Sequence, residues 1–496
     1  MRSPLNDIFT RVAADRPNHP AILGLSDGSV RTLSGVAEEA RTVGAVLRHS
    51  ALPGRACLLL HVGNHPAFVP LLLGCLETGT PAVLLDGVLT DVEVSALQQR
   101  LHAAGVVLRD DDPMFVGRTR IALPGGLVLV TWPDVDPLAW DPVVPAVVRL
   151  TSGSTALPKA ILATEDNLIA DGEHIAEAMA ITPAEVSLGV VPITHAYGFG
   201  NIALQLILQG TTIVLRDTFT PRQLMSDLHT HAVSAFFGVP FMFDYVRRNE
   251  PDPQPLLRSR LIVTAGAPID VATLRHFRGV WGRQIHSLYG TSETGGITFG
   301  ASDELGDVPS VGRPLPGVTV TLAPFEGTED GQGRVFVRGP NVMAGYLNLP
   351  GEPQSASLSA FVDGGYLTGD LARWNAGGEL VLAGRISPFV NVAGRKVHPE
   401  EVQRVLLALP GVANASVFGM PDELRGERLV AWVQRAPGSA LTMADIRGLC
   451  AERLAPYKIP RHFVFTDDAP VDARGKISRQ ALEGLVRDSL DRSFPV

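Results

Sequence analysis

The sequence predicts an α/β protein: a large α/β body with an antiparallel β subdomain, followed by a compact α+β unit. Three observations predict this fold class. In the first half, continuous apolar runs of strand length alternate with helical segments, as in parallel sheets covered on both faces. Over 308–349, short strand-like runs are spaced by Gly and Pro, which indicates antiparallel strands. After Arg385, helices and strands alternate in a unit of roughly 110 residues, an ordinary domain size.

The apolar runs of the first half give the expected strands in order. The run over 57–62 is followed by a helical stretch over 66–76, and a second helix is expected over 220–231. Further strands are expected over 81–85, 143–150, 211–215, 235–238 and 261–265.

In the β subdomain we expect strands over 318–322 and 334–338. In the last unit a helix begins near Pro399, with Glu400 and Glu401 in its first turn, and ends at Pro410. It is followed by strands over 415–418 and 429–434, a helix over 443–454 and a strand over 462–466.

Composition excludes several classes of protein. The net charge of −9 argues against nucleic acid as a partner. The three cysteines, Cys57, Cys75 and Cys450, are too widely spaced for a disulfide framework or a thiolate zinc site. No signal peptide is visible, and no apolar run reaches the ~18 residues of a membrane helix. We therefore expect a cytoplasmic protein without membrane insertion.

Lysine is unusually scarce in this chain. Of the 42 basic residues only four are lysines, and each lies in a segment punctuated by Gly or Pro. Lysine is a compact point charge, whereas arginine is a planar fork, so a site that needs one ammonium on a phosphate oxygen resists arginine. The lysine positions therefore indicate anion chemistry at Lys159, Lys396, Lys458 and Lys476.

Segment 150–159 is the first of four segments that suit a nucleotide. It follows an apolar strand and precedes a helix expected near Thr164. Its hydroxyl-rich turn offers N–H and O–H donors and ends in Lys159, a set that suits phosphate oxygens. It is not the Walker loop, because no Gly-Lys-Ser/Thr follows a four-residue spacer.

The other three segments are 289–295, 365–370 with Gly384 and Arg385, and 471–477. In the first, Tyr289 can lie on a purine and Glu293 can hold Mg²⁺. In the second, Asp370 can accept hydrogen bonds from both ribose hydroxyls. In the third, a tight turn presents Lys476 at its tip.

In order and spacing, the four segments resemble those of the adenylate-forming superfamily: acyl-CoA synthetases, nonribosomal adenylation domains and luciferases. The resemblance implies an N-terminal domain over 1–385, made of two α/β lobes plus a β subdomain, a hinge at 386–388 and a small mobile α+β lid over 389–496. It also implies an ATP-dependent, AMP-forming acid–CoA ligase that uses ATP, Mg²⁺ and coenzyme A. A carboxylate attacks the α-phosphate, pyrophosphate leaves, and a thiol then attacks the acyl-adenylate.

Carried over position by position, the resemblance assigns the nucleotide site. Tyr289 would stack on adenine, Asp370 would bind the ribose with Arg385 beside it, and Gly266, Gly290 and Thr291 would complete the nucleotide pocket. The residues that would cradle the β- and γ-phosphates are Thr151, Ser152, Gly153, Ser154, Thr155 and Lys159.

The resemblance also assigns the reacting centre. Lys476 would bridge the carboxylate and the α-phosphate, offsetting the repulsion between two anions. Ser292 would touch the α-phosphate and Glu293 would hold Mg²⁺. The sequence departs from the family pattern at two places. Ala156 stands where the family usually has Gly in the phosphate loop. Ser387, followed by Pro388, stands at the hinge position where the family usually has Asp or Lys.

For the acceptor thiol, Gly394 belongs to a loop that resembles the wall of the family's pantetheine tunnel. Arg395, Lys396, Lys458 and Arg461 are cations available for coenzyme A, or solvated surface charges. Free coenzyme A is favoured over an acyl carrier protein, since nothing in the last 30 residues resembles an attached carrier domain.

The acyl pocket is expected from segments 191–201 and 236–240, which resemble benzoate-type CoA ligases. Aromatic side chains interspersed with Gly form a short slot that suits a benzoate-like aryl acid, such as anthranilate or benzoate. His195 either gates the pocket, hydrogen-bonds a ring substituent, or is a satisfied core histidine. A short- or medium-chain aliphatic acid and a stand-alone adenylation enzyme loading a carrier protein are the alternatives. The predicted pocket residues are His195, Ala196, Tyr197, Gly198, Phe236, Phe237, Gly290 and Thr291.

Overall fold

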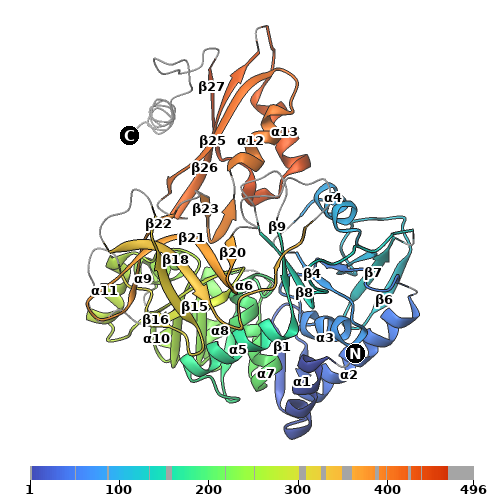
Figure 1. The fold of residues 1–496 in the computed structure, drawn as a ribbon, viewed down its shortest axis with the longest axis vertical. Coiled ribbons are helices and arrows are strands. Elements are labelled where there is room, and N and C mark those ends of the chain that lie inside the picture. Colours follow the sequence, from blue (N-terminus) through green and yellow to red (C-terminus); the bar gives the residue numbers. More distant parts are fainter. Residues whose placement is uncertain are drawn as a thin grey trace. The chain divides into compact units, whose positions relative to one another are not determined.

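The structure is a computed structural model (Figure 1). It describes residues 3–50, 52–85, 89–132, 134–151, 159–217, 219–250, 252–300, 309–325, 331–348, 360–385, 390–397, 399–422, 426–436 and 438–466. The described residues form two compact units, the first of 3–85, 97–151 and 159–385, the second of 89–96 and 390–466, with the gaps just given. None of the described helices combines the length and the apolar character that a membrane span needs.

The first unit contains a nine-stranded sheet with a parallel centre and antiparallel edges. From β1 through β11, β10, β12 and β13 to β14 every neighbouring pair is parallel, whereas β2, β15 and β16 pair antiparallel. In spatial order the strands are β16 (Arg313–Pro314), β15 (Gly295–Gly300), β14 (His286–Thr291), β13 (Leu261–Thr264), β12 (Ala235–Gly238), β10 (Val186–Gly189), β11 (Thr212–Leu215), β1 (Pro20–Gly24) and β2 (Val30–Thr32).

An eight-stranded sheet of the same unit has the same design. Strands β3, β4, β5 and β8 pair parallel, and the outer strands pair antiparallel. In spatial order the strands are β19 (Gly345–Tyr346), β9 (Lys159–Ala163), β8 (Val147–Thr151), β4 (Ala82–Leu84), β3 (Leu58–Leu60), β5 (Gly105–Arg109), β7 (Leu127–Thr131) and β6 (Arg120–Leu123).

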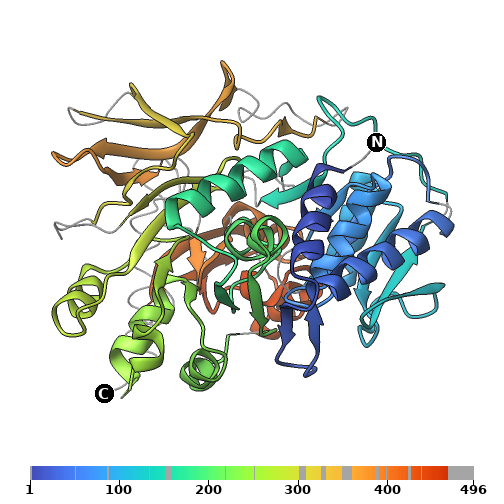
Figure 2. The ribbon, with the colours of Figure 1, turned by 90° about the horizontal axis from the view of Figure 1, so that it is seen from below.

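Helices cover these sheets, and one apolar core joins their inner faces. Figure 2 shows α2 against α3, and α7 contacts both α1 and α5. Helix α5 begins where the sequence predicts, because Thr164 caps it in a reciprocal capping box with Asn167. The helices are α1 (Pro4–Asp15), α2 (Leu33–His49), α3 (Phe68–Thr78), α4 (Asp91–Leu101), α5 (Glu165–Met179), α6 (Ala196–Gly198), the π-helical η1 (Phe199–Ala203), α7 (Leu204–Gln209), α8 (Pro221–Thr230), α9 (Pro240–Asn249), α10 (Gln254–Leu257) and α11 (Val271–Gly279).

The predicted β subdomain is a five-stranded antiparallel sheet. The predicted nucleotide segment 365–370 lies in its long central strand, β21. Asp370 is paired with Arg385 of β22, whereas on the β18 side it falls within a shift of register between Leu367 and Leu371. The strands are β17 (Thr319–Ala323), β18 (Gln332–Arg338), β21 (Gly365–Trp374), β20 (Phe361–Val362) and β22 (Leu380–Arg385).

The second unit has its own sheet and its own apolar core. Its strands β23, β24, β25 and β26 pair antiparallel, and β27 joins β26 in parallel. The elements are β24 (Arg395–Val397), β23 (Val390–Val392), β26 (Gly426–Arg435), β25 (Val412–Asp422), β27 (His462–Thr466), α12 (Pro399–Leu407), α13 (Met443–Arg453) and η3 (Pro456–Lys458).

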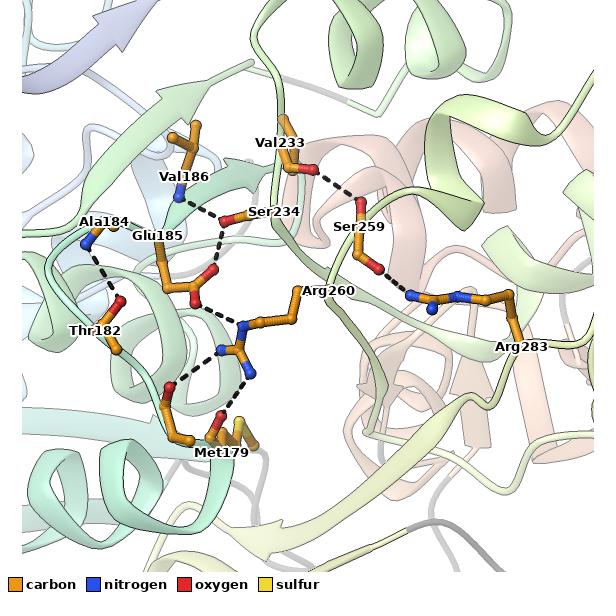
Figure 3. A network of polar contacts seen from close by, with 11 residues as sticks. Met179, Thr182, Ala184, Glu185, Val186, Val233, Ser234, Ser259, Arg260 and Arg283 are labelled. Carbon is orange, nitrogen blue, oxygen red and sulfur yellow. Dashed lines mark hydrogen bonds and ion pairs between the residues drawn. The ribbon is translucent and has the colours of Figure 1, made fainter.

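A closed polar network lies at the amino ends of β10, β12 and β13 (Figure 3). The buried carboxylate of Glu185 accepts from Ser234 Oγ and, at 2.7 Å, from Arg260 Nε. The two Nη atoms of Arg260 donate to the carbonyls of Met179 at 3.2 Å and Ala180 at 3.3 Å. Each of these charged atoms therefore has a partner, as expected of a network that stabilises the fold.

Candidate active site

The turn between β14 and β15 carries Ser292 and Glu293. The Thr291 and Thr294 hydroxyls lie 3.1 Å apart across it, and Met343 N donates to the Glu293 carbonyl at 2.9 Å. Gly290 must be a glycine, because a Cβ there would lie 2.3 Å from the carbonyl oxygen of Gly295. The turn is thus a fixed platform rather than a loose loop.

The Glu293 carboxylate lies among two tyrosines and a lysine. Tyr346 Oη donates to Glu293 Oε1 at 2.7 Å and lies 3.1 Å from Tyr366 Oη. Lys159 Nζ lies 5.5 Å from the centre of the Tyr346 ring. Burial lowers the pKa of Lys159, and the charge of Glu293 opposes that shift. Burial, with the nearby Glu293 charge, raises the pKa of Tyr346 and of Tyr366, so both remain hydrogen-bond donors.

These surroundings fit a Mg²⁺ ligand at Glu293. A carboxylate has acceptor capacity beyond one hydroxyl, so Glu293 can keep the Tyr346 bond and still bind a cation. Among the described residues no group of three or more His, Cys, Asp and Glu side chains could hold a metal ion alone. Mg²⁺ usually keeps waters and substrate phosphates as its other ligands, so a single protein carboxylate suffices.

The predicted adenine and ribose residues touch each other. Tyr289 Oη donates to Asp370 Oδ2 at 2.8 Å, and the two side chains are 8% and 6% exposed. Asp370 N donates to Thr368 Oγ1 at 3.0 Å, and Asp370 lies opposite Arg385 in the β21–β22 pairing. Gly266 has φ +86 and open space where a Cβ would stand, which suits close approach of a ligand.

The phosphate segment is described only at its ends. Thr151 is the last residue of β8 and the register partner of Lys159, the first residue of β9. The predicted residues Ser152, Gly153, Ser154 and Thr155 lie outside the described residues, as do Lys476 and the hinge at 386–388.

The predicted acyl segment begins at α6. His195 caps this turn, its Nδ1 accepting from Tyr197 N at 3.4 Å, and Ala196 follows. Tyr197 Oη donates to the carbonyls of Gly238 at 3.3 Å and Val263 at 3.1 Å. Gly198 allows the tight fold of this segment, since a Cβ would lie 2.3 Å from the Pro192 carbonyl oxygen.

Two predicted pocket residues need correction. Phe236 and Phe237 are both 0% exposed, so neither side chain lines an open pocket. Phe236 meets Phe243 edge to face at 5.7 Å, and Phe237 meets Tyr197 in the same manner at 6.3 Å. A strand of a parallel sheet is covered on both faces, so both residues of the pair lie in the core.

In the second unit, Gly394 occupies the turn between β23 and β24 with φ +86, and its N–H donates to Asn391 Oδ1 at 2.8 Å. Arg395 lies over the Tyr457 ring at 4.7 Å. Lys396 is in β24, and Arg461 is exposed.

Lys458 forms two ion pairs inside the second unit. Its Nζ lies 2.9 Å from Glu401 and 3.3 Å from Glu93, both in the second unit, and the residue is buried. Burial alone lowers the pKa of Lys458, but the acidic groups of Tyr457, Glu401 and Glu93 raise it overall. A lysine in this position stabilises the unit and is not a free phosphate ligand.

Sequence reasoning missed two buried charges beneath the β14–β15 turn. Arg149 Nη1 donates to the Ser292 carbonyl at 3.4 Å, and Asp171 Oδ1 accepts from Gly296 N at 2.8 Å. A signal existed for both: Arg149 interrupts an apolar strand, and Asp171 shares the buried face of α5 with Leu168 and Ile175.

The comparisons with known proteins place this site in a family. The AMP-binding enzyme family matches residues 9–347, and the AMP-binding enzyme C-terminal domain matches residues 401–476. The chain therefore belongs to the AMP-binding enzyme family.

Several of its relatives are acid–CoA ligases. The chain is 28% identical to sulfoacetate–CoA ligase of Cupriavidus necator, over 95% of each chain. It is 29% identical to feruloyl-CoA synthase of an Amycolatopsis species, over 86% of this chain and 87% of that one. A malonyl-CoA ligase structure with methylmalonyl-CoA and AMP bound matches with a TM-score of 0.75 and 27% identity, over 92% of this chain and 97% of that one. The protein is thus an ATP-dependent, AMP-forming acid–CoA ligase that uses ATP, Mg²⁺ and coenzyme A.

Proposed function

We propose that this ligase activates a benzoate-like aryl acid, such as benzoate or anthranilate. The observation that carries the proposal is the fixed ring of Tyr197. Its hydroxyl is held by the Gly238 and Val263 carbonyls, at the carboxyl ends of β12 and β13. Ligands of open α/β sheets bind at that edge. The residue is partly exposed, and in this proposal its ring is the aromatic surface on which the substrate ring packs.

His195 supplies the polar group of the proposed pocket. Because its Nδ1 accepts from Tyr197 N, the neutral ring carries its proton on Nε2. That N–H can donate to a ring substituent or to the substrate carboxylate. Feruloyl-CoA synthase among the relatives supports an aromatic acid. Sulfoacetate and malonyl ligases support the second candidate, a short aliphatic acid.

The proposed reaction assigns a role to each predicted residue. The acid carboxylate attacks the α-phosphorus of ATP and pyrophosphate leaves, with Lys476 and Ser292 stabilising the negative charge. Tyr289 and Asp370 hold the nucleoside, and the segment from Thr151 to Lys159 holds the leaving phosphates. When bound, Mg²⁺ at Glu293 neutralises phosphate charge. The coenzyme A thiol then attacks the acyl carbonyl and AMP leaves.

The proposed second step needs the lid of residues 389–496 to turn about the hinge at 386–388. Gly394 would line the pantetheine path, and Arg395, Lys396 and Arg461 would contact the phosphates of coenzyme A. An acyl carrier protein is the alternative acceptor, and cytoplasmic localisation remains part of the proposal.

The experiment is pyrophosphate release against a panel of benzoates, short diacids and octanoate, with coenzyme A, a carrier protein or neither. We expect a benzoate to give the highest kcat/KM and coenzyme A to be the acceptor. Tyr197→Leu should lower kcat/KM for the best benzoate about ten-fold or more, whereas the matched Tyr197→Phe keeps the ring and should cost less. If octanoate or malonate is the best substrate, the proposed aryl substrate is wrong, whereas the acid–CoA ligase reaction still holds.

A further inference from the structure

Two buried charged side chains hold the two ends of the turn that carries Glu293. Arg149, in β8, donates from Nη1 to the carbonyl of Ser292. Asp171, in α5, accepts from the backbone N–H of Gly296. The two side chains come from different elements, β8 and α5, and both bond to the backbone of segment 290–296, more than 100 residues further along the chain.

Neither charge is satisfied by these contacts. Arg149 is 3% exposed and Asp171 is 1% exposed. Within the described part of the chain, Arg149 Nε and Nη2 and Asp171 Oδ2 have no hydrogen-bond partner. A buried charge without full pairing costs stability, and apolar residues of similar size would serve the fold better. Stability alone therefore does not explain the pair.

Arg149 interacts electrostatically with both Asp171 and Glu293. Burial lowers the pKa of Arg149, and the negative charges of Asp171 and Glu293 both oppose that shift. Burial raises the pKa of Asp171 to about 6, and Arg149 opposes that rise. The guanidinium also lies 5.2 Å from the centre of the Phe199 ring, which fixes its direction.

We propose that Arg149 and Asp171 are positioning residues that set the Ser292–Glu293 turn for binding of Mg²⁺ and ATP. Arg149 holds the Ser292 carbonyl and places a cation near the Glu293 carboxylate; Asp171 holds the other end of the turn and balances that cation. The inference rests on the proposed role of Glu293. Without Arg149, Asp171 and Glu293 are two anions that have lost the buried cation acting on both, so the turn shifts.

The test measures metal binding directly. Binding of Mn²⁺ in the presence of ATP, without acid, is followed by electron paramagnetic resonance in wild type, Arg149→Met, Arg149→Lys and Glu293→Gln. Arg260→Met is the matched control, because Arg260 is an arginine of the closed network at the amino ends. Thioester formation from purified benzoyl-adenylate and coenzyme A reports the second step, which uses no metal-bound phosphate.

We expect Arg149→Met to weaken Mn²⁺ binding about ten-fold or more, the usual effect of losing an outer-shell partner. The Mn²⁺ affinity of Arg149→Lys should lie between those of Arg149→Met and wild type, because lysine keeps the positive charge but lacks the planar guanidinium. Benzoyl transfer by Arg149→Met and Mn²⁺ binding by Arg260→Met should stay within about two-fold of wild type.

Should Arg149→Met not fold, the double variant Arg149→Met with Asp171→Asn removes both charges together and is measured in its place. This double variant should fold, and its Mn²⁺ affinity should be lower than that of wild type. Wild-type Mn²⁺ binding by the Arg149 variant that folds overturns the inference. Wild-type binding by Glu293→Gln instead overturns the role of Glu293, so the two failures are distinguishable.

Discussion

Two arginine–carboxylate sets of the first unit are built differently: one lies at the amino ends of β10, β12 and β13, and the other, Arg149 with Asp171, contacts the β14–β15 turn. At the amino ends, both oxygens of Glu185 accept hydrogen bonds and three nitrogens of Arg260 donate (Figure 3). At the site, Arg149 uses one nitrogen and Asp171 one oxygen. The first set is complete and stabilises the fold. The second is incomplete and lies under the proposed metal ligand, so we expect its loss to affect ligand binding.

The largest effect should come from Glu293→Gln. Removing the carboxylate charge while keeping the shape should lower adenylation about 100-fold or more, because metal-assisted charge stabilisation is lost. The Tyr346 hydrogen bond can persist to the amide oxygen, so the melting temperature should change little. The rate of adenylation is measured by pyrophosphate exchange over a range of Mg²⁺ concentrations. Activity that recovers fully at ordinary Mg²⁺ would contradict the assignment.

The next effect is a pH dependence at Asp171. Its pKa is raised to about 6 by burial, so the folded state binds this proton more tightly than the unfolded state. Stability must then fall as pH rises from about 4 to about 6, by up to about 3 kcal/mol from this group. Asp171→Asn removes this titration, so across that window the stability of the variant relative to wild type should rise with pH, whatever constant cost the loss of the Arg149 counter-charge adds. Urea unfolding at a series of pH values measures both proteins, and parallel curves would refute the prediction.

Glu185→Gln should act on stability alone. It leaves the Ser234 hydroxyl and Arg260 with a poorer acceptor, and we expect a loss of about 2 kcal/mol in the free energy of unfolding. The loss is moderate because the Arg260 side chain is 44% exposed and can turn to water. Chemical unfolding measures it, with adenylation per folded molecule as the control. A large drop in that activity would contradict the expectation that the Glu185–Arg260 network acts on stability and not on ligand binding.

The smallest effect concerns Tyr346→Phe. Losing one hydroxyl donor to Glu293 should weaken metal binding about ten-fold. Tyr366→Phe is the comparison variant: its hydroxyl lies 3.1 Å from Tyr346 Oη and also interacts with Glu293, so its loss should weaken metal binding too, but less. Metal titrations of wild type and both variants measure the affinities, and wild-type affinity in Tyr346→Phe would contradict the prediction.

Most of the fold was predictable because its strands are short, apolar and bounded by turns. The expected strands at 235–238 and 462–466 match β12 and β27, and the helix expected over 443–454 is α13. The antiparallel edges of both large sheets were not predicted, because an apolar run carries no sign of its pairing direction.

The site was predictable where residues are adjacent in sequence, as in segment 289–295. Phe236 and Phe237 were misplaced because a strand covered on both faces does not reveal which side chain reaches a pocket. Arg149 and Asp171 were missed because their importance depends on a turn more than 100 residues away, near Ser292.

Gly295 shows how tightly this region constrains change in the sequence. A Cβ there would lie 2.1 Å from Asp171 Oδ1, and the residue has φ +66, which side chains rarely adopt. An alanine at 295 would thus expel the carboxylate, and Arg149 would lose its counter-charge. Substitutions at positions 149, 171 and 295 are therefore expected to depend on one another.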